Sequence, residues 1–192
     1  MCGMIKTKEQ LKEILFYEAQ RYKRKSVRCP LIELGERRIL WKYNYILRHA
    51  EYHYNAKNRV RYLLYRMRLA RLQCKYGVHI PINTCGKGLK IMHLGSILVN
   101  SNARIGENCT FHINTSIVAG GKNDDVPQLG NDIRICVGAV LLGGIKISDK
   151  CIIGANSVVN KSFEEEDITI AGVPARKISD RGVTEIRGGR DV

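Results

Sequence analysis

The sequence predicts a parallel β-helix, a coil of short stacked strands, preceded by an α-helical region. Three observations lead to this fold class. From Val99 onward the 192-residue chain falls into six-residue units that each open on a large apolar residue. Earlier in the chain, apolar residues recur with the 3.6-residue period of helices. The net charge also changes near residue 77. Residues 1–77 hold 19 Lys and Arg against 6 Asp and Glu, whereas residues 78–192 hold 13 against 12.

The first predicted helix lies in TKEQLKEILFYEAQRYKRK. Thr7, with Gln10 three residues later, has the spacing of a capping box at a helix start. Cys29-Pro30 ends the segment, because proline does not continue a helix. The apolar positions of this helix are Leu11, Ile14, Leu15 and Tyr22.

Two further helices are predicted in ERRILWKYNYILRHAEYHYN and KNRVRYLLYRMRLARLQCKYG. The later one ends at Gly77, a typical residue at a helix stop. Its apolar residues share one face: Val60, Leu63, Leu64 and Met67.

The six-residue units begin at ten positions that are all large and apolar. Because 44% of the chain is apolar, this regularity arises by chance on the order of once in a few thousand. The starting positions are Val99, Ile105, Phe111, Ile117, Leu129, Ile135, Leu141, Ile147, Ile153 and Val159. The fifth position is often small, as at Ala103, Cys109, Thr115, Ala139, Cys151 and Ser157, with Ile133 and Ile145 as exceptions.

Such a repeat suits strands that stack on the turn below, with aliphatic side chains inward and Gly, Asn and Asp at the corners. Three units make one turn of about 18 residues. We therefore predict an α-helical region over residues 1–77, a β-helix over residues 78–179 and a mobile tail over residues 180–192.

The composition favours a reduced, cytosolic protein. The seven cysteines are odd in number and have no Cys-x-x-Cys spacing, so neither disulfides nor a metal site are expected. No apolar stretch approaches the ~18 residues of a membrane span, and the N-terminus lacks the core of a signal peptide. The basic N-terminal part fits a solvated helical face, with contact to the inner face of an anionic membrane as an alternative. Nucleic acid is not expected as a partner, because no aromatic-basic motif accompanies the charge.

The hexads, the interruption GGKNDDVPQLG and the closing IAGVPARKIS resemble the hexapeptide-repeat acyltransferases, specifically their serine-acetyltransferase-like branch. The resemblance covers about residues 78–179. It implies a left-handed coil, a homotrimer and acetyl-CoA as co-substrate, with no permanently bound cofactor; pairing of trimers into a hexamer stays open. The segment LKIMHLGSILVNSNARIGENC is more similar in sequence to O-acetyltransferases of capsular and extracellular polysaccharide synthesis than to enzymes of cysteine biosynthesis.

The resemblance places the family's catalytic histidine at His93, as general base toward the acceptor hydroxyl. His93 lies six residues before Val99, at a unit start where an aliphatic residue is expected, so an imidazole there needs a reason. His112 follows 19 residues later, about one turn, and is a second candidate to contact the acceptor or the thioester. An outward surface position is the alternative for His112.

For the coenzyme, the resemblance implies a site along stacked turns, where small residues allow close approach of the coenzyme arm. The matching positions are Gly138, Ala139, Gly143, Gly144 and Ala155, although coil corners alone also favour such residues. Cations near the last turn match the coenzyme phosphates: Lys161, Arg176 and Lys177.

Three departures from the serine acetyltransferases concern the acceptor. Their orienting aspartate, fifteen residues before the histidine, is Val78 here, and their Arg-His pair before a loop proline is Asp125 and Val126. The chain ends in GGRDV, without the terminal Ile that docks to their partner enzyme. Because an acidic side chain repels a carboxylate, a sugar hydroxyl is the preferred acceptor. The loop offers it Lys122, Asn123, Asp124 and Asp125.

The other histidines are expected in structural roles. His79, before Pro81, suits a surface or core position at the entrance to the coil, with orientation of His93 as the alternative. His49 and His53, spaced i and i+4, lack a third metal ligand, so a solvated helix face is preferred for them.

The sequence therefore predicts an acetyl-CoA-dependent O-acetyltransferase that acts on a sugar hydroxyl in polysaccharide biosynthesis. A serine O-acetyltransferase of cysteine biosynthesis and a non-catalytic trimeric scaffold are the alternatives.

Overall fold

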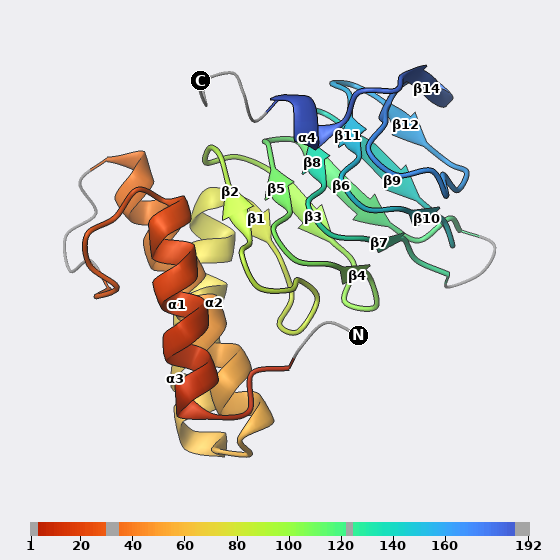
Figure 1. The fold of residues 1–192 in the computed structure, drawn as a ribbon. Coiled ribbons are helices and arrows are strands. Elements are labelled where there is room, and N and C mark those ends of the chain that lie inside the picture. The colour runs from red at the N-terminus through yellow and green to blue at the C-terminus, as the bar shows by residue number, and fades with distance from the viewer. Residues whose placement is uncertain (1–3, 30–34, 122–124, 187–192) are drawn as a thin grey trace.

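A computed structural model describes residues 4–29, 35–121 and 125–186 of the chain. Three long helices precede a coil of short strands and lie beside its first turns (Figure 1). The helices are α1 (Lys8–Arg21), α2 (Glu36–Asn55), α3 (Arg59–Tyr76) and a final turn, α4 (Val183–Ile186).

The coil has three faces, and each is a sheet whose strands come from successive turns. The strands pair in parallel, except that β14 pairs antiparallel with β13 at the end of the coil. Face 1 consists of β1 (Val78–His79), β3 (Ile97–Val99), β6 (Thr115–Val118), β9 (Val140–Leu142) and β12 (Val158–Val159). Face 2 consists of β4 (Arg104–Ile105), β7 (Gln128–Leu129) and β10 (Lys146–Ile147). Face 3 consists of β2 (Lys90–Ile91), β5 (Thr110–Phe111), β8 (Arg134–Ile135), β11 (Ile152–Ile153), β13 (Thr169–Gly172) and β14 (Ala175–Ser179).

The interior of the coil confirms the predicted six-residue register. All ten unit starts are buried, and they stack one above another, as Ile105, Leu129 and Ile147 do on face 2. The fifth positions also face inward, which explains why most of them are small. Each fully buried aliphatic side chain contributes about 1.5–3 kcal/mol, so the column of aliphatic residues is the main source of stability in this region.

The first turn departs from that register, and the expectation that His93 occupies an inward unit start is wrong. The buried residue of β2 is Ile91, which pairs with Phe111. Val99 pairs with Ile117, so the inward positions are 99 − 91 = 8 residues apart where the next turn has 117 − 111 = 6. Two extra residues widen the corner after β2. His93 lies in this corner with 57% of its side chain exposed.

The predicted start of α1 at Thr7 and end of α3 at Gly77 are confirmed by their hydrogen bonds. Helix α1 ends at Arg21, before the predicted break at Cys29-Pro30, and Pro30 lies outside the described residues. The Thr7 hydroxyl accepts from the Gln10 N–H at 3.2 Å, and the Gln10 side chain accepts from the Thr7 N–H at 3.1 Å. Gly77, with a φ of 71°, ends α3 in the left-handed region that glycine adopts without strain. Strand β1 begins one residue later.

A buried charged cluster joins the helices to the first turn of the coil. The cluster consists of Glu18 from α1 and of Arg48 and Glu51 from α2; Arg48 lies 2.7 Å from Glu18 and 2.8 Å from Glu51. All three side chains are at most 2% exposed. Their remaining hydrogen bonds go to backbone groups of the coil: Glu51 accepts from Asn83, Arg48 donates to Cys85 and Gly86, and Glu18 accepts from Gly88 and Leu89.

The shared apolar face of α3 points to solvent instead of the core. Val60 is 74% exposed, and Leu63, Leu64 and Met67 are exposed as well. Of the described helices, none is long and apolar enough to cross a membrane.

Part of the predicted tail is packed against the coil. Val183 in α4 is buried, and its N–H donates to the Lys150 carbonyl at 2.9 Å. Residues 187–192 of this predicted segment lie outside the described residues.

Candidate active site

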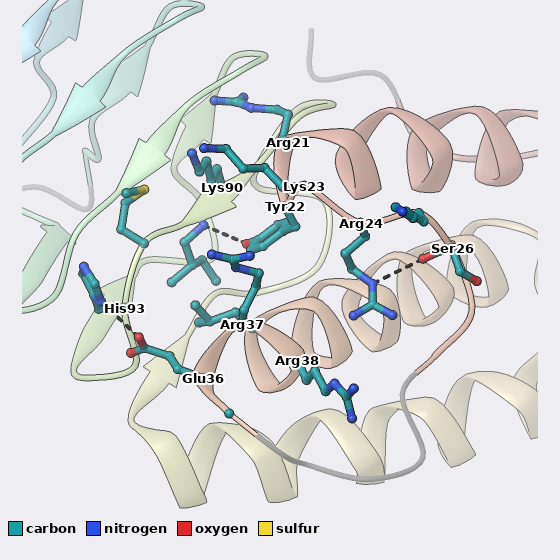
Figure 2. A pocket seen from close by; sticks show the side chains of 15 residues that line it. Arg21, Tyr22, Lys23, Arg24, Ser26, Glu36, Arg37, Arg38, Lys90 and His93 are labelled. Atoms are coloured by element: carbon teal, nitrogen blue, oxygen red, sulfur yellow. Dashed lines mark hydrogen bonds and ion pairs between the residues drawn. The ribbon is translucent and has the colours of Figure 1, made fainter. Parts of the chain in front are cut away.

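His93 lies where the start of α2 meets the widened corner of the coil (Figure 2). Its Nδ1 atom is 3.1 Å from Oε2 of Glu36, the first residue of α2. The other carboxylate oxygen of Glu36 accepts a hydrogen bond from the Leu94 N–H at 2.7 Å. One carboxylate therefore holds both the histidine ring and the backbone beside it.

The electrostatics of Glu36 favour its ionised form. Burial raises the pKa of Glu36, but the hydrogen bonds from the Leu94 N–H and from His93 outweigh this effect and lower it. An ionised carboxylate only accepts hydrogen bonds, so the proton of a neutral His93 belongs on Nδ1. The lone pair on Nε2 is then available to take a proton from another group.

Sequence reasoning did not find Glu36. It lies 57 residues before His93, at the start of another element, and no local pattern connects the two positions. Val78, at the position of the family's aspartate, is buried on β1 and carries no acceptor in its side chain. The only hint in the sequence is that Glu36 is one of six acidic residues in a strongly basic region.

His112 lies at the same corner one turn further along the coil. The Met92 N–H donates to the Phe111 carbonyl at 2.9 Å, so the two histidines follow neighbouring strands. Burial lowers the pKa of His112, and the charge of His93 lowers it further. The structure thus brings the two predicted histidines together along the edge that joins face 3 to face 1. We call this edge, formed by residues 92–96, 112–114, 136–139 and 154–157, the histidine edge.

Three of the predicted coenzyme residues lie further along the histidine edge. The Gly138 N–H donates to the Ile113 carbonyl at 3.0 Å, which stacks its corner on that of His112. Gly138 has a φ of 72°, and a Cβ there would lie 2.1 Å from Oδ1 of Asn156, so the corner itself requires glycine. Ala155 is exposed. Ala139 is fully buried at its inward position.

Gly143 and Gly144 lie on a different edge, between face 1 and face 2. A Cβ on Gly144 would lie 2.9 Å from Cβ of Asp125, so the backbone passes close to the end of the long loop. The predicted set of small residues is therefore divided between two edges of the coil.

The predicted phosphate-binding cations are also dispersed. Lys161 follows β12 on the edge of Gly143, with Nζ 5.4 Å from the ring centre of Phe163. Arg176 lies on β14 and is exposed. Lys177 forms ion pairs with Glu165 and Asp180, so its charge is already balanced.

A strongly basic cavity of about 840 Å³ opens beside His93. The end of α1, the start of α2 and strand β2 form its walls (Figure 2). Glu36 and His93 lie at one end. The cavity is lined by seven Lys and Arg residues: Arg21, Lys23, Arg24, Lys25, Arg37, Arg38 and Lys90.

His49 and His53 do not form the solvated helix face that was predicted. Both rings stack on Tyr65, with ring centres 4.8 and 5.3 Å away. The Nδ1 atoms of both are buried and without a hydrogen-bond partner among the described residues. In the described ranges, no group of three or more His, Cys, Asp or Glu could hold a metal ion.

The remaining predicted residues lie apart from His93. His79 is exposed on β1, at the entrance to the coil. Asp125 is exposed at the end of the long loop, whereas Lys122, Asn123 and Asp124 lie outside the described residues.

The chain is similar in sequence to serine acetyltransferases. It is 33% identical to the serine acetyltransferase of Staphylococcus epidermidis over 138 residues, which cover 70% of this chain and 63% of that protein. It is 34% identical to the serine acetyltransferase of Staphylococcus aureus over 110 residues, which cover 56% of this chain and 51% of that protein. The matches thus span about half to two thirds of the relatives' length. No protein-family profile matches the chain.

Solved structures with the same fold are also serine acetyltransferases. The enzyme from Brucella abortus superposes with a TM-score of 0.72 at 23% identity, covering 92% of this chain and 72% of that one. Its complex with coenzyme A has a TM-score of 0.71 at 24% identity, covering 91% and 70%. The Neisseria gonorrhoeae enzyme in complex with serine has a TM-score of 0.63 at 21% identity, covering 90% and 70%.

The hexad repeat, the three-faced coil and the likeness to these solved structures define a left-handed β-helix fold built from hexapeptide repeats. The proteins that the chain resembles in sequence are serine acetyltransferases. The finer prediction of a polysaccharide O-acetyltransferase finds no support among them.

Proposed function

We propose that this chain is an acetyl-CoA-dependent O-acetyltransferase in which His93 is the general base. The observation that carries this proposal is the contact between Nδ1 of His93 and the Glu36 carboxylate. It holds the ring by one nitrogen and leaves the other for an acceptor hydroxyl. The same contact argues against a non-catalytic scaffold, because Glu36 then takes the orienting role of the family's aspartate, whose position is Val78 here.

The proposed transfer needs no covalent enzyme intermediate. Nε2 of His93 takes the proton of the acceptor hydroxyl as the oxygen attacks the carbonyl carbon of the thioester. A carbon–oxygen bond forms, the carbon–sulfur bond breaks, and the proton passes from Nε2 to the coenzyme A sulfur. Because the thioester is already activated, the protein mainly aligns the two substrates and stabilises the developing oxyanion.

The donor would lie along the histidine edge, beyond His112. Gly138 and Ala155 carry no side chain beyond Cβ at this edge, and Arg176 supplies an exposed cation near its end. A structural neighbour from Brucella abortus binds coenzyme A, which supports the same donor here. We also propose the homotrimer that the resemblance implies, in which a second copy would cover this edge.

The comparisons favour L-serine as acceptor over a polysaccharide sugar, the reverse of the preference from the sequence. The sequence relatives are serine acetyltransferases, and one structural neighbour contains serine. Asp125 and Val126 still differ from the family's Arg-His pair, so this chain would need other cations for the serine carboxylate. L-Serine is therefore the reference acceptor for testing the reaction.

The test is release of coenzyme A thiol from acetyl-CoA with L-serine and with alcohols of other classes. Replacing His93 by alanine should lower kcat about 10²–10⁴-fold with whichever acceptor is used. His79→Ala removes an exposed histidine away from the cavity and should leave the rate unchanged. Thiol release by His93→Ala at the wild-type rate would relocate the base, and no release with any acceptor would overturn the proposed function.

A further inference from the structure

The basic cavity beside His93 has an unusual charge for a site that accepts a small zwitterion. Among the described residues that line it, seven are Lys or Arg and one, Glu36, is acidic. Figure 2 shows Lys23 directed toward Lys90 and Arg37 directed toward Tyr22, so cations from α2, from β2 and from the end of α1 converge. Arg24 and Arg38 lie toward the end away from His93 (Figure 2).

Most of these cations, Lys90 apart, form no ion pair with a described carboxylate. Arg21 donates to Thr110 at 3.1 Å and to the Gly88 carbonyl, and Arg24 donates to the Ser26 carbonyl at 3.2 Å, so both meet neutral acceptors. Within the described part of the chain, no carboxylate forms an ion pair with Lys23, Lys25, Arg37 or Arg38. Burial lowers the pKa of Arg24, and the charge of Arg38 lowers it further, as expected for like charges that face each other. An anion would relieve this repulsion.

The size of the cavity also exceeds what L-serine needs. Its volume of about 840 Å³ lies within the ~300–1,000 Å³ of pockets that bury ligands much larger than an amino acid. The cavity reaches the histidine from the side of the helices, whereas the proposed donor runs along the histidine edge in the other direction. A molecule that fills it therefore meets His93 as an acceptor would.

We infer that the basic cavity binds the acceptor, and that this acceptor is a hydroxyl compound that carries phosphate. The inference rests on the proposed acetyl transfer at His93 and makes the acceptor larger and more negative than L-serine. Guanidinium groups suit phosphate because they donate two parallel hydrogen bonds to its oxygens. The cations are spread over both helices and β2, so they can bind more than one anionic group.

The cavity is a poor match for a nucleic acid strand. Strands are bound on open grooves with exposed aromatic rings that stack on the bases. The aromatic residue of this cavity is Tyr22, which is buried and accepts a hydrogen bond from the Ile91 N–H at 2.8 Å.

During transfer the phosphate stays unchanged: a hydroxyl of the same molecule gives its proton to His93 and receives the acetyl group, and the coenzyme leaves as a thiol.

The inference is tested with pairs of acceptors that differ only in phosphate. Glucose and glucose 1-phosphate are compared for thiol release from acetyl-CoA, together with L-serine, and calorimetry measures glucose 1-phosphate binding without acetyl-CoA. Lys23→Gln/Arg37→Gln removes two exposed cations of the cavity. Arg66→Gln is the matched control, since it removes an exposed cation on α3. Thermal unfolding checks that each variant is folded, and the two single variants replace the double one if it is not.

We expect kcat/KM for glucose 1-phosphate to exceed that for glucose by roughly tenfold or more, the size of a charge-assisted hydrogen bond. Lys23→Gln/Arg37→Gln should lower binding and kcat/KM for glucose 1-phosphate roughly tenfold. Arg66→Gln should behave as wild type. His93→Ala should bind glucose 1-phosphate normally but not acetylate it.

Two results would overturn the inference while the proposed function stands: thiol release with L-serine and none with glucose 1-phosphate, or equal rates for glucose and its phosphate. No thiol release with any acceptor would instead remove the proposed function.

A further arm of the experiment uses phosphatidylinositol in phosphatidylcholine vesicles as the acceptor. Acetylation of that lipid in preference to free inositol 1-phosphate would identify a lipid-linked source of the phosphate, and the reverse preference a soluble one.

Discussion

The coil and its junction with the helices are stabilised by opposite kinds of residue. In the coil, an aliphatic side chain enters the interior every six residues, and each packs on an equivalent residue one turn away. At the junction, the buried groups are charged, and Arg48 lies between Glu18 and Glu51 while all three bond to the backbone of the first turn. Apolar packing is tolerant of position, whereas a buried ion pair holds only in one geometry.

This difference matters for the site, because the site lies between the two regions. His93 belongs to the coil and Glu36 to α2, twelve residues and about 18 Å of helix before Arg48. The charged cluster therefore fixes α2 along its axis and sets where its first residue meets the histidine. The regular coil holds His93 in a stable scaffold, and the junction decides how Glu36 is aligned with it.

Breaking the charged cluster should have the largest effect on stability. Arg48→Ala leaves two carboxylates buried without their cation, and we expect the free energy of unfolding to fall by about 3–5 kcal/mol. Urea denaturation measures the change, with Arg66→Ala on α3 as the control, expected within about 0.5 kcal/mol of wild type. A loss of less than about 1 kcal/mol would mean that the cluster contributes little to the junction.

The coil should respond to loss of volume instead of charge. Ile147→Ala removes a buried side chain of β10 and should cost about 2–4 kcal/mol, because a cavity opens in the aliphatic column. Lys146→Ala, the neighbouring residue on the outer surface of the same strand, should cost under about 0.5 kcal/mol. Equal losses from the two variants would contradict the observed register.

Acid should weaken the helical region through His49. Burial, with a further contribution from the charge of His53, lowers the pKa of His49 from 6.5 to about 4, so folding favours the neutral ring. That contribution is complete above pH 6.5 and is lost as the pH falls toward about 4. Allowing for partial exposure of the ring, it amounts to about 1–3 kcal/mol.

The variant for this test is His49→Phe, which keeps a ring against Tyr65 and cannot titrate. Denaturation midpoints measured from pH 6.5 to pH 4 should fall less steeply for this variant than for the wild type. Parallel curves would show that His49 does not contribute to acid sensitivity.

Loosening the contact between the two regions should affect activity more than stability. Glu36→Gln keeps the size of the side chain but removes the charge that holds His93, and kcat should fall on the order of tenfold with little change in KM. Because Glu36 is partly exposed, the effect on unfolding should be below about 1 kcal/mol.

The pH dependence of stability tests whether the charge of Glu36, and not only its packing, holds His93. Since the pKa of Glu36 is lowered in the folded protein, its contribution is complete above its ordinary value of 4.5 and is lost as the pH falls further. Wild type and Glu36→Gln should therefore differ in stability near neutral pH and converge in acid. A variant with wild-type kcat would remove Glu36 from the proposed mechanism.

Much of the fold could be predicted from the sequence because it follows local periodicity. The ten unit starts, the capping box of Thr7 and Gln10 and the stop at Gly77 all depend on residues close together in the chain. The prediction was wrong at His93, where two extra residues in a corner shifted the register. A six-residue count carried backward from Val99 could not detect them.

Less of the site could be predicted. His93 was found from the resemblance and His112 from its spacing of about one turn, and both lie along one edge. Gly143 and Gly144 lie on another edge, and Ala139 is buried. The apolar face of α3 was recognised, although its exposure was not. His49 and His53 were expected on a solvated face but stack on Tyr65 of another helix, a contact that their own spacing could not predict.

The sequence by itself determined the coil, its inward residues and the excess of positive charge in the first 77 residues, because each is a property of neighbouring residues or of composition. Only the tertiary structure decided that Glu36 meets His93, that Glu18, Arg48 and Glu51 form one buried cluster, and that some of the basic residues line a cavity beside His93. These contacts join residues far apart in the chain, and their geometry depends on how whole helices pack against the first turn.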